Sequence, residues 1–356
     1  MSMTIPASSR GSVLVAVLVL VAFGVLLLTR LIESGNADLL LAMRQADRDR
    51  LRADAYGALE TTLAVLVDFR TVDGNLYAPA QGWGDPLACA GYTPREGLTL
   101  DVGFEDESGR VSLPAASLET LAKLLVQAGI GSGDAPRVAD GLYGWMHREH
   151  VVTYLSPGAR AESAAPPFRG LRSFEELAHV TEAARFFYGP DGAPTPALAA
   201  FQRLVSLYRF GQTNLNAAPP AVLVASGWTE LQARTLDERR ARETKGRGFL
   251  RSAEEAGAPA GGWGTSVQLL RINVTARQGA AHLLLSALVT WDGLASLPPP
   301  MERKQAGTIL PMENSSAPAP PLGTKTSPGA LQYPFTILEL SESTQPVKPE
   351  SHEPAA

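Results

Sequence analysis

The chain has 356 residues, a formal net charge of −5, five histidines and a single cysteine, Cys89. The negative charge gives no electrostatic reason to expect a nucleic-acid polyanion as the main partner. One cysteine cannot form an internal disulfide framework, and the scattered histidines show no zinc-type ligand spacing.

The first predicted element is an uncharged apolar run from Gly11 to Thr29, preceded by a short leader that ends in Arg10. A helix of that length spans about 28 Å, close to the hydrocarbon thickness of a bilayer. A cleaved secretory signal has a shorter apolar region and a small-residue cleavage site, and no such site follows this run. Arg10 before the run and Glu33 after it predict a cytoplasmic N-terminus and an exported remainder.

The run is predicted to continue as an amphipathic helix. No proline occurs between Leu31 and Phe69, and apolar residues such as Leu59, Leu63 and Leu66 recur three or four positions apart. On these residues alone, an ordinary uncleaved anchor with a helical stalk is an alternative, and such an anchor would keep its leader.

With these features the chain resembles the type IV pilin and pseudopilin superfamily. In that family a prepilin peptidase cuts after the glycine that ends a short basic leader, and the apolar run remains as the N-terminal helix. The matching residues are Arg10, Gly11 and Ser12. The resemblance implies a leader over 1–11, cleavage between Gly11 and Ser12, methylation of the Ser12 amine, and a pilin helix over 12–70.

One position departs from the family pattern. Most members carry a glutamate as the fifth mature residue, whereas this chain has Ala16. The glutamate is understood to neutralise the N-terminal ammonium of a neighbouring subunit, because an unpaired charge in an apolar filament core is costly. A subunit without it suits the filament tip, and the family known for lacking it is the K-type minor pseudopilins of type II secretion, which this chain resembles.

Residues 71–112 are predicted to form a loop over 71–97 and then a first strand, because apolar residues alternate over 98–104. An acidic cluster follows, and its simplest interpretation is a solvated turn. Calcium binding is the alternative, since members of the family bind calcium through oxygen ligands. The candidate ligands are Asp101, Glu105, Asp106 and Glu107.

Residues 113–262 are predicted to form an α-helical insert with two helix-hairpin-helix (SAM-like) units, in which 118–127 pairs with 137–148 and 221–226 pairs with 230–244. An Arg-Ser-x-Glu-Glu motif follows each pair and offers a Ser-x-x-Glu capping box. These motifs begin at Arg172 and Arg251.

The strongest family resemblance within the insert is an Asn-x-Asn-x-Ala-Pro stretch. It comprises Asn214, Asn216, Ala218 and Pro219. Read without the family, Asn216 is expected near a helix N-cap with prolines in the first turn, and Gly227 is expected to end that helix. Thr229 is expected to cap the next helix.

Residues 263–296 are predicted to form a β-hairpin that turns near 278–280, because apolar residues alternate on both sides. The predicted fold class is therefore α+β: a long N-terminal helix, a small antiparallel sheet packed on it, and a large inserted α-helical domain. Residues 297–356 are predicted to be a Pro-rich disordered tail, within which the apolar segment 335–338 is either a docking strand or idle.

No catalytic constellation is recognisable, so the sequence predicts a protein that is not an enzyme. His147 and His150 lack a third metal ligand and are interpreted as a helix end. The glycines Gly129, Gly131 and Gly133 lack the preceding strand that a dinucleotide-binding loop requires.

The resemblance implies a minor pseudopilin at the pseudopilus tip of a type II secretion system, supporting pseudopilus assembly and protein export across the outer membrane. It would cross the inner membrane of a Gram-negative-type bacterium once, with a periplasmic C-terminal domain. The implied partners are minor pseudopilins of the I and J types, the major pseudopilin, the inner-membrane secretion platform and the prepilin peptidase. No cofactor is required, and Ca²⁺ is implied by resemblance alone.

The alternative function is a membrane-anchored helix-hairpin-helix protein for DNA binding or uptake. Between Trp228 and Arg251 there are seven Lys or Arg against four Asp or Glu, which favours this alternative. A few surface arginines are usually a solvated helix face, so nucleic acid is not the expected partner.

Overall fold

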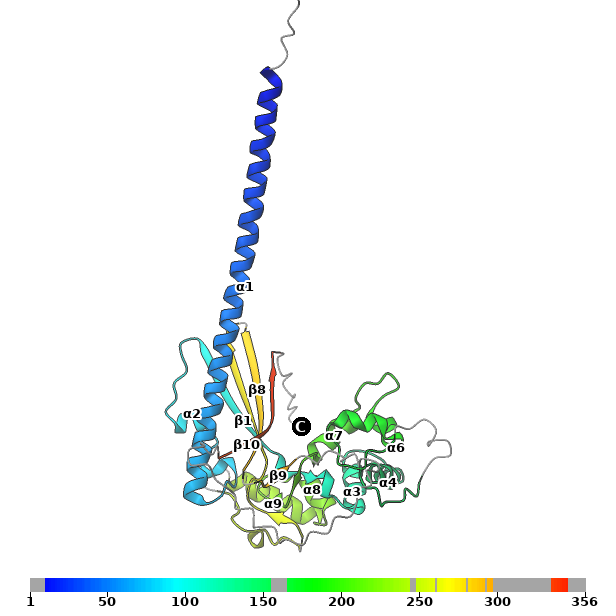
Figure 1. The fold of residues 1–356 in the computed structure, drawn as a ribbon. Helices are drawn as coiled ribbons and strands as arrows, with labels where there is room; N and C mark the ends of the chain where they lie inside the picture. Colours follow the sequence, from blue (N-terminus) through cyan, green and yellow to red (C-terminus); the bar gives the residue numbers. More distant parts are fainter. Residues whose placement is uncertain are drawn as a thin grey trace, which may run out of the picture.

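A computed structural model describes residues 10–154, 165–243, 248–259, 261–279, 281–291, 293–296 and 334–344. One long helix projects from a body that contains a small sheet and a group of shorter helices (Figure 1). This arrangement confirms the predicted α+β class. Most of the predicted leader, the predicted helix end at Thr244 and most of the C-terminal tail lie outside the described residues.

The long helix α1 runs from Arg10 to Asp73, so it covers the predicted helix over 12–70 and continues slightly further. Its described side chains between residues 14 and 50, which we call the exposed arm, are all exposed. From residue 51 onward one face is buried at helical spacing. The buried side chains of this face are Leu51, Ala55, Ala58, Leu59, Thr62, Leu63 and Leu66.

Four antiparallel strands form the main sheet in the order β1-β7-β8-β10. Their bounds are β1 Leu98–Asp106, β7 Leu270–Gln278, β8 Ala281–Thr290 and β10 Thr336–Ser343. Strands β7 and β8 are joined at Gly279, whose φ of 56° lies in the left-handed region that glycine favours. The predicted hairpin is confirmed, and the predicted strand over 98–104 extends to Asp106.

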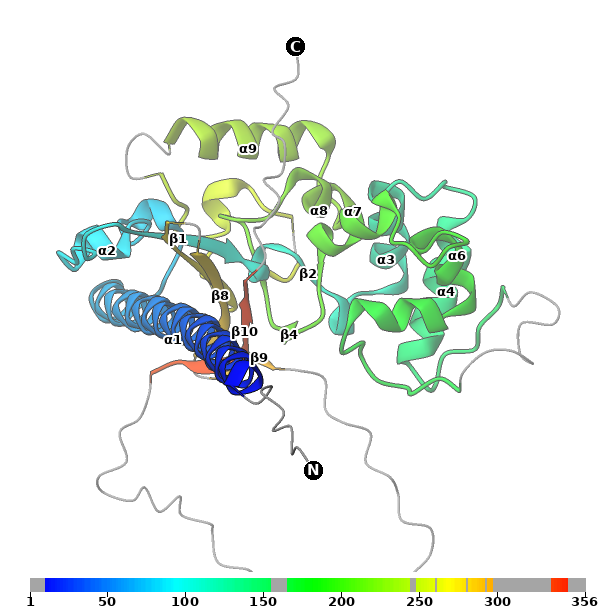
Figure 2. The ribbon, with the colours of Figure 1, turned by 90° about the horizontal axis from the view of Figure 1, so that it is seen from above.

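Helix α1 covers one face of this sheet, as seen along the helix in Figure 2. Side chains that point toward α1 meet in register across the strands, for example Val274 on β7 and Leu285 on β8, both fully buried. Full burial of one such aliphatic side chain contributes about 1.5–3 kcal/mol. The C-terminal part of α1 is therefore held as part of the body.

The predicted loop over 71–97 contains two short helical segments, η1 Pro79–Gln81 and α2 Pro86–Cys89. The Asp85 carboxylate accepts a hydrogen bond from the Ala88 N–H at 3.1 Å and caps α2. Trp83, between the two segments, is fully buried and packs edge-on against Phe104 of β1 at 4.9 Å between ring centroids. This segment thus closes one end of the core between α1 and the sheet.

Between β1 and β7 the chain forms a helical insert with a hydrophobic core of its own. Phe187 and Phe201 are its largest fully buried side chains, with ring centroids 5.2 Å apart. The α-helices of the insert are α3 Leu118–Gln127, α4 Ala135–Met146, α6 Thr181–Phe187, α7 Pro196–Leu204, α8 Pro220–Ala225 and α9 Glu230–Glu243.

Short strand pairs and 3₁₀ turns lie within the insert and where it meets the sheet. The strand pairs are β2 Val111–Ser112 with β3 Val205–Ser206, β4 Arg209–Phe210 with β9 Ala295–Ser296, and β5 Thr213–Asn214 with β6 Trp263–Gly264. The 3₁₀ turns are η2 Glu107–Gly109, η3 Leu113–Ala115, η4 Phe174–His179 and η5 Glu254–Ala256.

The two predicted helix pairs end their first helices in the same way. After α3 and α8 the chain enters the left-handed region at Gly129 (φ 94°) and Gly227 (φ 102°). The N–H of the next residue, Ile130 or Trp228, then donates back to the helix at 3.0 or 3.1 Å, and both side chains are buried. The predicted cap of α9 also forms, as Thr229 and Gln232 exchange hydrogen bonds at 3.0 and 3.2 Å.

The expected Ser-x-x-Glu capping boxes are wrong. The carboxylates of Glu176 and Glu255 accept instead from the backbone N–H of the arginine that begins each motif, Arg172 at 3.0 Å and Arg251 at 3.4 Å. The helices that follow are the 3₁₀ turns η4 and η5, so the spacing of an α-helical N-cap does not apply. The two motifs nevertheless keep matching contacts.

The prediction of a disordered tail is wrong at residues 336–343, where the docking-strand alternative for the apolar segment 335–338 holds. Residues 336–343 form β10, which pairs with β8 along the sheet edge. Composition misled the prediction, because a short strand can lie inside a segment whose flanks are rich in proline. Residues 297–333 and 345–356 lie outside the described part of the chain.

Candidate functional site

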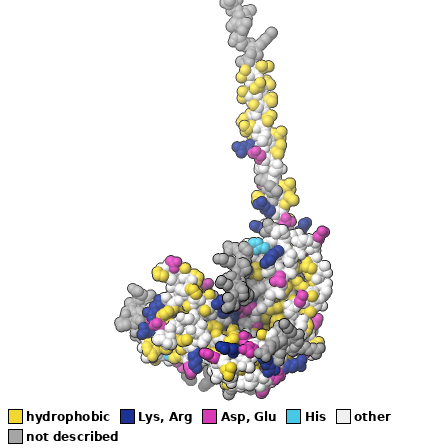
Figure 3. Space-filling model, turned by 180° about the vertical axis from the view of Figure 1, so that it is seen from behind, with side chains coloured by type: hydrophobic (Ala, Val, Ile, Leu, Met, Phe, Trp, Pro, Cys, Tyr) yellow, Lys and Arg dark blue, Asp and Glu magenta, His cyan; other side chains and the backbone are white. Residues whose placement is uncertain are grey.

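The outer part of the exposed arm carries a continuous apolar surface. Its large hydrophobic side chains between Leu14 and Leu28 are each at least 53% exposed. In Figure 3 they cover the outer part of the rod that projects from the body, and charged side chains follow nearer the body. The helix is long and apolar enough to cross a membrane.

The residues of the expected cleavage site lie at the start of this arm. Gly11 and Ser12 belong to the first turn of α1, and Ala16 lies about one turn further on, on the exposed surface. The helix is uninterrupted from this end to the sheet, so the exposed arm and the part of α1 that packs on the sheet form one continuous helix.

The family-motif residues lie where the insert meets the sheet. We call this region the junction, and it comprises Asp106, Glu107, Ser108, Asn214, Asn216 and Arg271. Asn214 is fully buried, and its amide donates to Asp106 Oδ2 at 2.6 Å and to the Tyr77 carbonyl at 3.2 Å. Its Oδ1 accepts from the Asn216 N–H at 3.0 Å. Every hydrogen-bonding group of this buried amide side chain therefore has a partner.

Asn216 does not cap a helix as expected, and this correction reassigns its role. Its amide donates to the carbonyls of Leu250 at 2.9 Å and Thr265 at 2.7 Å, and its oxygen accepts from the Leu250 N–H at 2.7 Å. The N-cap of α8 is Pro219, while Ala218 is fully buried. The motif thus makes hydrogen bonds to four residues distant in sequence, Tyr77, Asp106, Leu250 and Thr265.

A buried ion pair completes the junction. Glu107 is 4% exposed, and its Oε1 lies 2.6 Å from Arg271 Nη2 and 2.8 Å from Arg271 Nε. The Ser206 hydroxyl donates to its other oxygen at 2.9 Å. The interpretation of this acidic stretch as a solvated turn is therefore wrong, because burial of Glu107 depends on these charge-assisted bonds.

The four candidate calcium ligands are not brought together. Asp101 and Glu105 lie on β1 with exposed side chains, about 13 Å apart along the strand. Glu105 pairs with Arg110, and Asp106 and Glu107 are engaged within the junction. Over the described residues no group of three potential metal-ligating side chains is found. Calcium binding remains a prediction from resemblance.

The electrostatics of the junction act most strongly on Asp106. Burial raises the pKa of Asp106 to about 6, although hydrogen bonds from Ser108 and Asn214 oppose the rise. Burial also lowers the pKa of Arg110 to about 10, with a further contribution from the nearby charge of Arg271. Asp106 therefore changes its protonation in mild acid.

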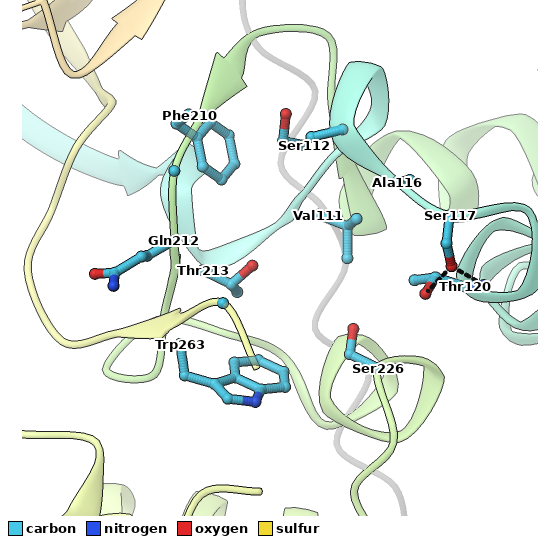
Figure 4. Close-up of a pocket in the computed structure, with 13 residues that line it drawn as sticks. Val111, Ser112, Ala116, Ser117, Thr120, Phe210, Gln212, Thr213, Ser226 and Trp263 are labelled. Carbon is cyan, nitrogen blue, oxygen red and sulfur yellow. Dashed lines mark hydrogen bonds between the residues drawn. The ribbon is translucent and has the colours of Figure 1, made fainter. Parts of the chain in front are cut away.

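A cavity of about 320 Å³ lies between the junction and the start of α3 (Figure 4). Two of its hydroxyl groups are engaged within the fold: Ser112 donates to the Tyr208 carbonyl at 2.9 Å, and Ser117 accepts from the Thr120 N–H at 3.1 Å. Phe210 and Trp263 supply its aromatic lining, and no titratable side chain lines it. This cavity offers neither an acid nor a base for catalysis.

The two histidines serve the fold of the insert. His150 Nε2 lies 2.6 Å from Asp140 Oδ1, and the ring of His147 stacks on Tyr143 at 4.0 Å. Asp140 is buried and also accepts from two backbone N–H groups of the following loop. Asp140, through His150 and these two N–H groups, therefore fixes the chain after α4.

The arginines of α9 are used inside the insert. Arg240 donates to the carbonyls of Leu215 and Ala218 at 3.0 and 2.8 Å, and Arg239 donates to the Glu255 carbonyl at 2.9 Å. These contacts fix α9 against the family motif. Holding a DNA phosphate would require breaking them, which weakens the electrostatic case for a DNA-binding surface here.

Sequence reasoning missed Arg271, Ser206 and Ser108. Arg271 lies within the predicted hairpin, and no local pattern links it to Glu107. The pairing of β1 with β7, which sets Glu105 opposite Arg271, would have brought the acidic strand end to this arginine.

Together these features define a protein with a membrane-capable N-terminal helix, a small antiparallel sheet packed on it and a helical insert. No protein-family model matches the chain, and no curated protein matches it significantly. Its structure is similar to a chain of the GspK-GspI-GspJ complex from the type 2 secretion system of enterotoxigenic Escherichia coli, with a TM-score of 0.48 and 13% identity, covering 72% of this chain and 96% of that one. Likeness at this level assigns no function, so the function has to be inferred from the chain's own features.

Proposed function

We propose that this chain is a minor pseudopilin of the K type, a non-enzymatic subunit of a type II secretion system. The observation that carries the proposal is α1, a single 64-residue helix whose apolar arm is exposed and whose other end packs on an antiparallel sheet. Such a helix can leave the membrane and pack into a filament without losing its contacts with the body. The leader sequence and the motif at Asn214 add independent support.

The topology of the proposal follows from the arm. The short N-terminus lies in the cytoplasm, α1 crosses the inner membrane once, and the sheet and insert lie in the periplasm. The prepilin peptidase would cut between Gly11 and Ser12 and the Ser12 amine would be methylated.

The tip position rests on Ala16. A methyl side chain there cannot neutralise the ammonium group of a subunit ahead, so the chain is suited to a place where none lies ahead. From the tip it would support pseudopilus assembly and export across the outer membrane. Its partners would be minor pseudopilins of the I and J types, the major pseudopilin and the inner-membrane secretion platform.

Calcium binding is proposed from resemblance alone. Asp101 is the candidate ligand with an exposed carboxylate and no ion pair among the described contacts of β1, and a site there would need further oxygen ligands from elsewhere. No other cofactor is proposed.

The decisive experiment is mass spectrometry of the full-length protein from cells with and without an active prepilin peptidase. We expect a chain that starts at methylated Ser12 only when the peptidase is present. Gly11→Leu should retain the leader, because it changes the residue before the cut. Gly24→Ala is the matched control, since Gly24 lies in the same helix with open space around it, and it should be processed normally.

An intact leader in cells whose peptidase processes other substrates would overturn the proposal. That result would favour the uncleaved anchor, in which the arm remains in the membrane and the body is displayed on its surface.

A further inference from the structure

The edge of β8 is covered by a strand that comes from far along the chain. β10 pairs with β8 from Thr336 opposite Thr290 to Ser343 opposite Leu284, with a bulge between Ile337 and Glu339. Residues 297–333 connect it to the body and could reach about 120 Å at full extension. A connection of this length does not by itself restrict β10 to the β8 edge.

One end of the covered edge provides an aromatic anchor point. Phe335, just before β10, is 4% exposed and packs edge-on against Trp291 at 5.6 Å between ring centroids. Trp291 is itself 1% exposed and belongs to the core between α1 and the sheet. Phe335 thus inserts one ring into an existing core.

At the other end, Glu342 binds to α1. Its Oε1 accepts from Arg52 Nη2 at 2.7 Å, from Arg52 Nε at 2.9 Å and from the Tyr56 hydroxyl at 2.7 Å. The Tyr56 hydrogen bond is the main reason that the pKa of Glu342 lies below its ordinary value, and Arg52 contributes too. This end of β10 is recognised by a cation and a hydroxyl group.

A second acidic side chain is recognised on the opposite face of the strand. Glu339 Oε2 lies 3.2 Å from Arg271 Nη2 and 3.4 Å from the Tyr208 hydroxyl. Burial, followed by the charge of Glu339, raises the pKa of Tyr208 to about 12, so the phenol stays protonated and able to donate. The two glutamates of β10 therefore each meet one arginine and one tyrosine.

β10 differs from the other long strands in how little it buries. On β7 the alternate side chains from Leu270 to Ala276 are fully buried, whereas on β10 Ile337 and Leu340 remain 41% and 45% exposed. The strand is thus held by its backbone ladder, one aromatic anchor, the half-buried Leu338 and two glutamates. Peptides that bind by adding a strand to a sheet edge are held in the same manner.

We propose that the edge of β8, with Trp291 at one end and Arg52 with Tyr56 at the other, is a strand-binding site, and that the chain's own segment 335–343 occupies it as an exchangeable ligand. The site selects an extended peptide with an aromatic residue at its start and acidic residues four and seven positions later. When the segment leaves, it uncovers both the β8 edge and the Arg52 face of α1. This inference does not depend on the proposed secretion role.

The test uses the full-length protein with a protease site placed within residues 310–320. After cleavage, size-exclusion chromatography should show the C-terminal fragment still bound to the body. An excess of a fluorescent peptide of residues 334–344 should then replace the fragment, with saturable binding measured by anisotropy.

Three variants of that peptide test the recognition. Phe335→Ala should bind at least about tenfold more weakly, because it removes the buried ring. Glu342→Gln should bind about threefold to tenfold more weakly, since it removes a partly exposed charge-assisted contact. Ser341→Ala is the matched control, because its exposed side chain makes none of the described contacts, and its affinity should be unchanged.

Three outcomes would overturn the proposal. The cleaved fragment could dissociate with no rebinding of the peptide, so that the edge is not a binding site. It could stay bound against excess peptide for days, so that it is not exchangeable. Concentration-dependent dimers that exchange their C-terminal segments before cleavage would instead identify a second copy as the source of the occupant.

Discussion

The core between α1 and the sheet and the core of the helical insert are built on different principles. The first joins segments that are distant in sequence, since β1 pairs with β7 and α1 packs on both. The second consists of helices that mostly contact helices near them in sequence, such as α3 with α4 and α8 with α9. The two apolar clusters are separate. The buried polar groups of the junction connect them, together with a small third cluster in which Tyr208 and Phe210 of the insert pack against Leu288 of β8. Apolar packing thus builds each part, and the junction with this third cluster fixes how the parts are oriented.

The largest expected effect is a cavity in the core of the insert. Phe187→Ala should lower the free energy of unfolding by about 3–5 kcal/mol, because Phe187 is fully buried against Phe201. Urea denaturation would measure the loss. Leu231→Ala, which changes a 74% exposed side chain on α9, should change stability by less than about 0.5 kcal/mol.

Hydrogen exchange would then sharpen the comparison between the two cores. In Phe187→Ala the loss of protection should concentrate in α3 to α7, while β7 and β8 keep most of theirs. Equal loss of protection in the sheet would mean that the two cores unfold as one unit and are not independent in stability.

The second effect concerns the junction. Glu107→Gln should cost about 2–3 kcal/mol, because it leaves Arg271 without its buried counter-charge while the contact with Glu339 remains. The matched control is Glu119→Gln, since Glu119 and Lys123 form an exposed ion pair on α3, and it should cost far less than Glu107→Gln. Similar losses in the free energy of unfolding of both variants would show that the buried Glu107–Arg271 pair contributes no more to stability than an exposed ion pair.

The third effect is a pH dependence assigned to Asp106. Its pKa is raised from 3.8 in the unfolded chain to about 6 in the fold, so the folded state holds the proton more tightly. This contribution is fully present below pH 3.8 and is lost as pH rises through about 6. After discounting for its half-buried position, we expect a loss of about 1–2 kcal/mol over that range.

Thermal denaturation of Asp106→Asn between pH 3.5 and 7.5 would check this dependence. The amide cannot ionise, so the difference between the variant and the natural chain should change across that window. A constant difference at every pH would assign the dependence to another group.

The smallest expected effect is on DNA binding. Because Arg239 and Arg240 are used within the insert, filter-binding titrations should give weak affinity with little dependence on salt. A steep salt dependence that Arg234→Ala reduces would instead favour the DNA-uptake alternative, since Arg234 lies on the exposed face of α9.

Local patterns predicted much of this fold. The long helix, the helix pairs at α3–α4 and α8–α9, and the hairpin of β7 and β8 each follow from periodicity, glycine stops or caps within a short window. The helix α6 was missed because it is short. The strand β10 was predicted only as one of two alternatives for the segment 335–338, because it lies in a region whose composition indicates disorder.

The junction could not be predicted either, and the reason is different: its contacts join residues that are far apart in the sequence. Its central pair joins Glu107 and Arg271, which are 164 positions apart, and Asn216 binds segments 34 and 49 positions away. The motif around Asn214 was recognised from resemblance, but its physical role required the path of the whole chain. A helix N-cap was the only local role available to Asn216, and that role was wrong.

The position of the insert within the sheet has a consequence for the chain as a whole. The end of β1 at Asp106 lies opposite the start of β7 at Leu270, and the Ser108 N–H donates to the Leu269 carbonyl at 3.4 Å. Topologically, β1 and β7 are therefore the two arms of a single hairpin whose turn has been expanded into a domain. Because the two ends of the insert meet, the sheet and α1 could close with a short turn in its place, and the insert could change in size or shape without altering the helix that anchors it.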